Sequence, residues 1–170
     1  MSLTPKPGVL DIHAYVGGRA HAPGVAQCIK LSSNEAALGP SPDAVAAYMA
    51  AHDSLSIYPE GSARILREAL AEAHGLNADR IVCGNGSDEL LSLLAHCYLR
   101  PGDEVLYSAH AFLVYRIAAL ANSAMPVEVP EPQLRVDVDA MLAAVSARTR
   151  DNDGLPMLHI RLYLDRSTPC

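Results

Sequence analysis

The middle of the chain reads Arg80-Ile-Val-Cys-Gly-Asn-Gly-Ser-Asp-Glu-Leu90. Its apolar run Ile81–Cys83 predicts a short buried strand, and the two glycines that follow predict a tight turn. Ser87-Asp88-Glu89 is typical of a helix start, where unpaired backbone N–H groups and the positive end of the helix dipole favour an anion. Because glycine lets a backbone approach a ligand closely, the stretch predicts a phosphate-binding turn.

The same residues also fit a purely structural turn in which Ser87 or Asp88 caps the helix. A dinucleotide fingerprint requires Gly-x-Gly-x-x-Gly, but the sixth position here is Glu89. Its side chain would crowd the close helix–strand packing that a third glycine permits. No Gly-Lys-Ser/Thr follows, which excludes a Walker loop. A nucleotide- or phosphate-binding module and a simple capped turn both stay open on these residues alone.

Helix and strand patterns alternate along most of the chain, which favours an α/β fold with parallel strands. Further strands are predicted at 105–107 and 126–129, and helices at 42–52, 65–74, 88–99, 112–122 and 138–145. The helix at 88–99 is apolar on nearly all sides and is expected to be central. We interpret residues 1–41 as an N-terminal arm, 42–150 as a partial α/β domain and 151–170 as a tail that breaks the pattern.

Three helix ends carry local signals. Ser41-Pro42-Asp43 combines an N-cap serine, a proline at the first helical position and an acid in the first turn. Gly75 follows an apolar stripe at helical spacing and is a natural C-cap. Asp137 is a candidate N-cap for the last helix. These positions fix where the helices should begin and end.

Composition excludes several classes of function. Half of the 170 residues are hydrophobic, so we expect a folded domain, and the net charge of −6 argues against nucleic acid and anionic membranes as partners. No apolar run is long enough to span a bilayer, and the first ten residues lack the apolar segment of a signal peptide, which favours the cytoplasm. No Cys-x-x-Cys pair or histidine cluster suggests a metal site.

The chain contains two lysines, Lys6 and Lys30. A Schiff-base lysine needs a dry pocket that lowers its pKa, and neither local sequence suggests one. Both are expected to be surface charges. Neither lysine is therefore a candidate for a Schiff base.

Seven segments, taken in order, resemble the histidinol-phosphate aminotransferases, which are pyridoxal-phosphate enzymes. They are Leu31-Ser-Ser-Asn-Glu35, Leu38-Gly-Pro-Ser-Pro42, Tyr58-Pro-Glu-Gly-Ser62, Arg67-Glu-Ala-Leu70, Gly84-Asn-Gly-Ser-Asp-Glu-Leu90, Pro101-Gly-Asp-Glu-Val105 and Phe112-Leu-Val-Tyr115. The likeness implies an N-terminal arm and an incomplete three-layer α/β/α large domain of a fold-type I pyridoxal-phosphate-dependent transferase. It also implies homodimers that transfer an amino group between histidinol phosphate or imidazole-acetol phosphate and 2-oxoglutarate or glutamate.

The resemblance assigns five residues to the cofactor. Gly86, Ser87 and Asp88 would hold the phosphate group of pyridoxal phosphate through backbone N–H groups. Phe112 would stack on the pyridine ring, where relatives often carry tyrosine. Tyr58 would reach the phosphate that the partner subunit holds.

For the small-molecule substrate, the resemblance implies Tyr15 and Asn34 as pocket residues. Ala36-Ala37 stands where the family usually has Asn-Pro. The family also needs a Schiff-base lysine, an aspartate for the pyridine nitrogen and arginines for the substrate, all of which lie beyond the equivalent of Arg150. We therefore expect the 170 residues to be inactive alone, with weak or no cofactor binding. They would be an enzyme remnant or a non-catalytic partner of a complete subunit.

A testable prediction concerns the segment after Arg150. In the family an Asn-Pro-x-x-Pro-Thr-Gly segment follows an apolar strand there, whereas Asp151–Cys170 has no resemblance to it. Our hypothesis is a frameshift or a truncated gene. Translating the coding DNA in the other two frames should yield the strand and the motif, and the frameshift hypothesis fails if neither frame contains them.

Overall fold

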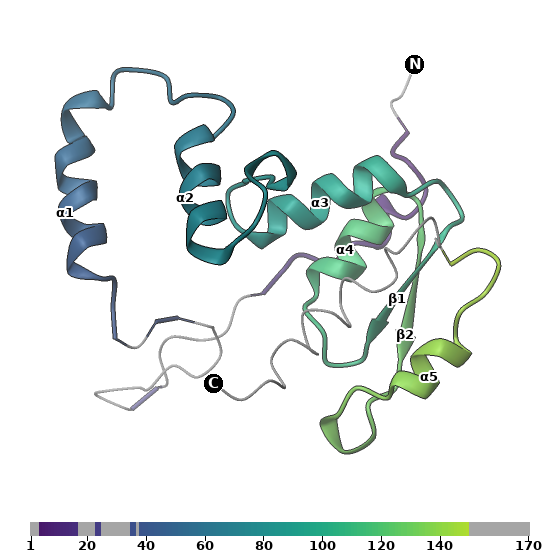
Figure 1. The fold of residues 1–170 in the computed structure, drawn as a ribbon. Helices are drawn as coiled ribbons and strands as arrows, with labels where there is room; N and C mark the ends of the chain where they lie inside the picture. The colour runs from purple at the N-terminus through teal and green to yellow at the C-terminus, as the bar shows by residue number, and fades with distance from the viewer. Residues whose placement is uncertain (1–3, 17–22, 25–34, 37, 150–170) are drawn as a thin grey trace. The chain divides into compact units, whose positions relative to one another are not determined.

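The computed structural model describes residues 4–16, 23–24, 35–36 and 38–149. They belong to two compact units (Figure 1). One draws on Met1–Ala14 and Gly84–Cys170, and the other on Tyr15–Cys83. The described part of the chain contains no helix with the length and apolar character that crossing a membrane requires.

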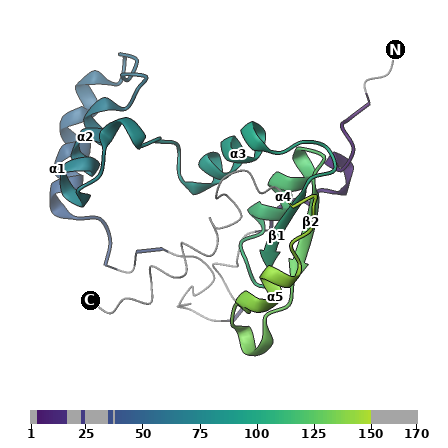
Figure 2. The same ribbon diagram turned by 45° about the vertical axis from the view of Figure 1, so that its right-hand side comes forward.

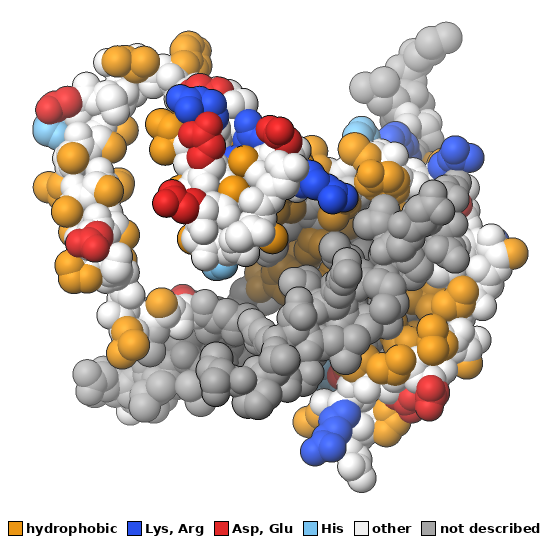
Figure 3. All heavy atoms as spheres, in the orientation of Figure 1, with side chains coloured by type: hydrophobic (Ala, Val, Ile, Leu, Met, Phe, Trp, Pro, Cys, Tyr) orange, Lys and Arg blue, Asp and Glu red, His pale blue; other side chains and the backbone are white. Residues whose placement is uncertain are grey.

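The Tyr15–Cys83 unit begins its regular structure with α1 (Pro42–Ala50), which continues into the 3₁₀ turn η2 (Ala51–Ser54). The Ser41 hydroxyl accepts the Ala44 N–H at 3.1 Å, and proline occupies the first helical position. The predicted cap is therefore confirmed. No residue of α1 is buried, and its apolar side chains stand on the surface (Figure 3).

The second helix of this unit, α2 (Arg64–His74), is held at both ends. The Glu60 carboxylate accepts the N–H groups of Ser62 and Arg64, each at 2.9 Å. With the Ser62 side chain, these bonds lower the Glu60 pKa to about 2. Gly75 ends the helix at φ 64°, which confirms the predicted C-cap.

A side chain of α2 also connects the segments that flank the helix. The Arg67 guanidinium donates to the carbonyls of Ser62 and Ala78, both at 2.9 Å. Ala78 opens the short 3₁₀ helix η3 (Ala78–Arg80). One arginine therefore fixes the chain before and after α2.

The other unit contains a small parallel sheet with helices on it. Its elements are η1 (Val9–Asp11), α3 (Ser87–Tyr98), β1 (Glu104–Ser108), α4 (Val114–Ala121), β2 (Met125–Val129), η4 (Pro132–Leu134) and α5 (Val138–Ala143). Strand β1 pairs with β2 in parallel, from Glu104 opposite Met125 to Ser108 opposite Val129. The Asp137 carboxylate accepts the Ala140 N–H at 3.0 Å, which confirms the predicted cap of α5.

Thr149 extends the sheet on the free edge of β1. It forms a parallel bridge with Glu104, whose N–H donates to the Arg148 carbonyl at 2.8 Å. On the opposite edge the Asp103 carbonyl accepts the Met125 N–H at 2.7 Å. The order across the sheet is thus Thr149, β1, β2.

This strand order produces three layers. The crossover from β1 to β2 through α4 and the crossover from β2 to Thr149 through α5 run in opposite directions across the sheet. Because such crossovers are right-handed, α4 and α5 must cover opposite faces. Contacts of α4 with both strands and of α5 with β1 agree with this arrangement, and the two helices lie on different sides of the strand pair (Figures 1 and 2). The α/β fold class is confirmed.

The core of the described residues lies between these layers. Its buried apolar side chains are Ala95, Tyr107, Ala119, Leu120, Ala124, Val129 and Met141. They come from α3, both strands, α4 with its following turn, and α5. The sheet is therefore what brings the helices of this unit into contact.

Two sequence predictions are wrong. Ile81–Cys83 is not a strand, and the side chain of Val82 is 73% exposed. A strand needs a neighbour for its backbone groups, and ladder pairing within the described residues involves only β1, β2 and Thr149. The helix at 88–99 forms as α3, but Ala95 is its one buried residue, so it is not central.

A buried carboxylate joins the start of β1 to the segment before Thr149. Glu104 is 7% exposed and accepts from the Ser146 hydroxyl at 2.5 Å and from Arg148 Nε at 2.9 Å. The Ser146 bond first, and then Arg148, lower the pKa of Glu104 from its ordinary value of 4.5. The cluster holds the segment before Thr149 against the first residue of β1.

We expect Glu104→Gln to lower the urea midpoint at neutral pH, because Ser146 and Arg148 lose their charged acceptor. Folding lowers the pKa of Glu104, so the ionised carboxylate stabilises the folded state fully above about pH 4.5. This stabilisation is lost as the pH falls from there toward the lower pKa of the folded state. The midpoint of the parent should fall with acid more steeply than that of the variant. Glu128→Gln, on exposed Glu128 of β2, is the control, and equal acid sensitivity of parent and E104Q would contradict the assignment.

Candidate functional site

The glycine turn before α3 has the backbone shape that the sequence suggested. Gly86 is the N-cap of α3 with φ 84° and ψ 178°, a conformation that side chains other than glycine rarely adopt. A Cβ there would meet nothing within 4 Å, so the requirement for glycine is conformational. At Gly84 a Cβ would come within 2.9 Å of the Glu89 carboxylate, so this second glycine makes room for that side chain.

Glu89 folds back onto the turn. Its Oε2 accepts the Asn85 N–H at 2.5 Å and the Asn85 side-chain amide at 3.1 Å. The N-cap of α3 has no side-chain cap bond, so the alternative in which Ser87 or Asp88 caps the helix is wrong. The first backbone N–H groups of α3 lack partners within the helix by geometry, and the residues that carry them are exposed. The turn can therefore receive an anion from solvent.

Phe112 lies between the carboxyl end of β1 and the start of α4. It is exposed, and its carbonyl accepts the Tyr115 N–H at 3.1 Å. Carboxyl ends of parallel strands are where open α/β sheets bind ligands. Since α3 contacts α4, Phe112 and the glycine turn each lie at the N-terminal end of one of two packed helices.

The other predicted site residues belong to the Tyr15–Cys83 unit or lie outside the described residues. Tyr58 is 97% exposed, and Tyr15 is exposed as well. Asn34 lies outside the described residues. The roles that the resemblance gave to these three residues stay predictions.

Three polar side chains that the sequence analysis did not single out lie at the carboxyl end of the strand pair. Ser108 ends β1 and is 2% exposed, and the Glu131 side chain, two residues after β2, is 6% exposed. Glu131 Oε2 lies 2.7 Å from His110 Nδ1. Hydrogen bonds from Ser108 first and then from His110 lower the Glu131 pKa. Polar residues just after two consecutive predicted strands were the available signal.

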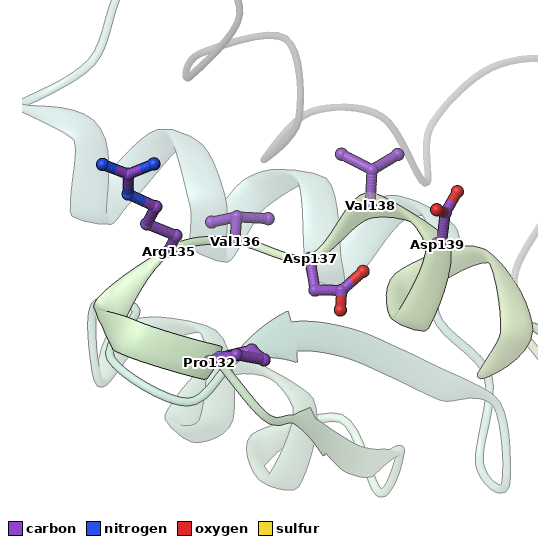
Figure 4. A pocket seen from close by; sticks show the side chains of 6 residues that line it. All are labelled: Pro132, Arg135, Val136, Asp137, Val138 and Asp139. Atoms are coloured by element: carbon purple, nitrogen blue, oxygen red, sulfur yellow. The ribbon is translucent and has the colours of Figure 1, made fainter.

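An open hollow of about 290 Å³ lies on the connection from β2 to α5, lined by Pro132, Arg135, Val136, Asp137, Val138 and Asp139 (Figure 4). Its charged side chains do not converge, because Arg135 points away from Asp137 and Asp139. Asp137 is already used as the cap of α5. Across the described ranges, no three histidine, cysteine or carboxylate side chains come together as metal ligands.

Residues 26–156 match the model of the aminotransferase class I and II family. The chain belongs to this family. The resemblance that the seven segments suggested is thus confirmed, and the small parallel sheet is part of a fold-type I pyridoxal-phosphate-dependent transferase fold.

Individual relatives narrow the comparison. The histidinol-phosphate aminotransferase of Rhodopseudomonas palustris (strain TIE-1) is 57% identical over 148 residues, which are 86% of this chain and 40% of that protein. The enzyme of Ruegeria sp. (strain TM1040) with the same name is 53% identical, over 87% of this chain and 41% of that protein. The chain thus spans about 40% of the length of these curated relatives.

A solved relative agrees with them. The crystal structure of histidinol-phosphate aminotransferase from Sinorhizobium meliloti, in complex with pyridoxal-5'-phosphate, superposes with a TM-score of 0.65 at 27% identity. The superposition covers 68% of this chain and 32% of that chain. The likeness therefore extends from the sequence to the fold.

We expect Gly86→Ala to destabilise the start of α3 by about 1 to 3 kcal/mol, because alanine must adopt the strained φ of 84°. Gly61→Ala is the matched control, since a Cβ at Gly61 also meets nothing within 4 Å and its φ is not positive. Urea unfolding and amide exchange of the first turn of α3 measure the effect. Equal stability losses in G86A and G61A would show that the backbone of the turn does not need glycine.

Proposed function

We propose that these 170 residues form part of the cofactor-binding domain of a histidinol-phosphate aminotransferase. The reaction would be pyridoxal-phosphate-dependent transamination between histidinol phosphate or imidazole-acetol phosphate and 2-oxoglutarate or glutamate, in histidine biosynthesis. The observation that carries the proposal is 53 to 57% identity to enzymes of that name over nearly nine-tenths of the chain. A cytoplasmic location belongs to the same proposal.

The residues at the glycine turn fit a phosphate group. Gly86 supplies the backbone angle, and the N–H groups of Ser87 and Asp88 open α3 on the solvent side. Backbone donors and the positive end of the helix dipole both favour an anion there. The Glu89 carboxylate is occupied by Asn85, so it stabilises the turn. These contacts would bind and orient the phosphate of pyridoxal phosphate.

Phe112 would provide the flat apolar surface for the cofactor ring. An exposed aromatic side chain at the carboxyl end of a parallel strand can stack on a planar heterocycle and exclude water from one of its faces. When bound, pyridoxal phosphate supplies an electron sink for the bond changes at the substrate carbon. The contribution of Phe112 is to hold the ring in place.

A homodimer with shared sites is part of the proposal. Tyr58 is 97% exposed in a turn that Glu60 shapes, so its hydroxyl is accessible to a second subunit. Its predicted contact is the phosphate held by that subunit. The same exposure also favours the second candidate, a non-catalytic partner that pairs with a complete aminotransferase subunit. Co-purification of a tagged chain with such an enzyme, lost in Tyr58→Ala, would favour it.

A polypeptide of these 170 residues is proposed to be inactive alone. Transamination needs a lysine that bonds to the cofactor and moves a proton, and the chain has Lys6 and Lys30. Lys6 is exposed, and Lys30 lies outside the described residues. The side chain of Lys6 therefore stands in water and not in the dry pocket that a Schiff-base lysine needs. The expected loss relative to a complete enzyme is many orders of magnitude.

The experiment adds pyridoxal phosphate to the purified chain and records the visible spectrum and the transamination rate with histidinol phosphate. We expect no stable band of a lysine-bound cofactor and no turnover. Lys30→Ala and Lys6→Ala should leave the spectrum unchanged. A stable band that disappears in Lys30→Ala, together with turnover, would refute the proposed inactivity.

A further inference from the structure

The turn that carries Phe112 is attached to the end of β2 by backbone and side-chain contacts. The Ala109 N–H donates to the Val129 carbonyl at 2.9 Å, so pairing continues one residue past β1. The Ala111 N–H then donates to the Ser108 carbonyl at 2.8 Å and closes the turn. Glu131, two residues beyond β2, places a carboxylate whose side chain is 6% exposed next to His110 of this turn.

The topology gives this position a functional meaning. After β1 the chain leaves toward the face covered by α4, and after β2 it leaves toward the face covered by α5. Adjacent parallel strands whose connections leave to opposite faces open a crevice at their carboxyl ends, which is where ligands bind in α/β sheets. Ser108 and His110 belong to the first connection and Glu131 to the second. The three residues therefore lie at the edge of the sheet where such ligands bind.

The hydrogen-bond roles within the group follow from its chemistry. The lowered pKa keeps Glu131 ionised, and an ionised carboxylate can only accept. The Ser108 hydroxyl and His110 Nδ1–H are therefore the donors, the latter at 2.7 Å. His110 is 59% exposed, whereas Glu131 and Ser108 are buried, so the carboxylate is the inner partner and the imidazole the outer one.

We propose that Glu131 is a positioning residue for Phe112: by holding the Ser108 hydroxyl and the His110 imidazole together, its carboxylate fixes the turn that presents the aromatic ring to the cofactor. This inference rests on the proposed function, in which Phe112 stacks on pyridoxal phosphate. His110 lies two residues before Phe112, and Ser108 lies four residues before it. Fixing both side chains restricts the backbone on the strand side of Phe112, while α4 restricts the other side.

The chain has no tryptophan, so Phe112→Trp introduces a single tryptophan whose fluorescence reports on position 112. In that background we would compare Glu131→Ala, His110→Ala and His110→Asn, whose side-chain amide can replace the Nδ1–H donor. Glu128→Gln is the matched control, because Glu128 is an exposed glutamate of β2, the strand that leads to Glu131. Amide exchange at Ala109 and Ala111 reports the turn. Quenching of the introduced tryptophan by deoxypyridoxine phosphate, which lacks the aldehyde that reacts with amines, reports stacking.

We expect E131A to speed exchange at Ala109 and Ala111 by about tenfold or more, as loss of a charged hydrogen-bond acceptor predicts. H110A should show a smaller increase that H110N reverses, and E128Q should match the parent. The ligand concentration for half-maximal quenching should rise in E131A and H110A but not in H110N. Because His110 is largely exposed, the H110A and H110N pair remains informative even if E131A fails to fold.

Two results would overturn the proposal: equal exchange in E131A and E128Q, or equal behaviour of H110A and H110N. Quenching of the tryptophan reporter that is the same in all variants would also overturn it while leaving the proposed function intact. If instead the turn loosens as expected and the phosphate ligand quenches the reporter in no variant, the anchoring by Glu131 stands and the cofactor-stacking role that the proposed function gives to Phe112 fails. The two failures are therefore distinguishable.

Discussion

Parallel pairing of β1 with β2, with Thr149 on the other edge, is the constraint on which the described site depends. Parallel strands place their carboxyl ends on one edge, so residues from two different connections meet there. The opposite directions of the two crossovers put α4 and α5 on different faces and leave this edge accessible. A register slip of one residue would turn the side chain of Ser108 to the other face and remove it from Glu131.

The same strand is held at its two ends by similar chemistry. At its start Glu104 accepts from the Ser146 hydroxyl and from Arg148, and past its end Glu131 accepts from the Ser108 hydroxyl and from His110. A buried carboxylate costs free energy unless hydrogen bonds satisfy it, so each acts only when its neighbouring segment is in place. In both cases a carboxylate shielded from solvent connects one strand end to a segment distant in sequence. These two links specify position more than they add to the hydrophobic core.

Features that depend on neighbouring residues could be predicted from the sequence, whereas features that depend on distant segments could not. The caps at Ser41, Gly75 and Asp137 were predicted because each depends on residues within one helical turn. The segment Ile81–Cys83 was mispredicted because a strand depends on a neighbour elsewhere in the chain. Glu131 and His110 are 21 residues apart. Polar residues after two predicted strands pointed to this edge of the sheet, but only the strand register shows that these two side chains meet. The role proposed for Phe112 comes from family resemblance, whereas the contact between Glu131 and His110 comes from the structure.

The free energies of the proposed cofactor contacts show why a fixed position of Phe112 would matter. Two charge-assisted hydrogen bonds from the N–H groups of Ser87 and Asp88 would contribute about 3 to 6 kcal/mol, and the helix dipole about 1 kcal/mol more. Association alone costs roughly 4 to 15 kcal/mol in lost translational and rotational freedom. The acidic side chains of Asp88 and Glu89 in the same first turn reduce the attraction of this helix end for an anion. These contributions reach only the lower part of the association cost, so the glycine turn by itself would bind a phosphate cofactor weakly at best. A second contact would have to add its free energy with little ordering cost of its own, and an aromatic ring on a turn that Glu131 fixes, as proposed, would meet that condition.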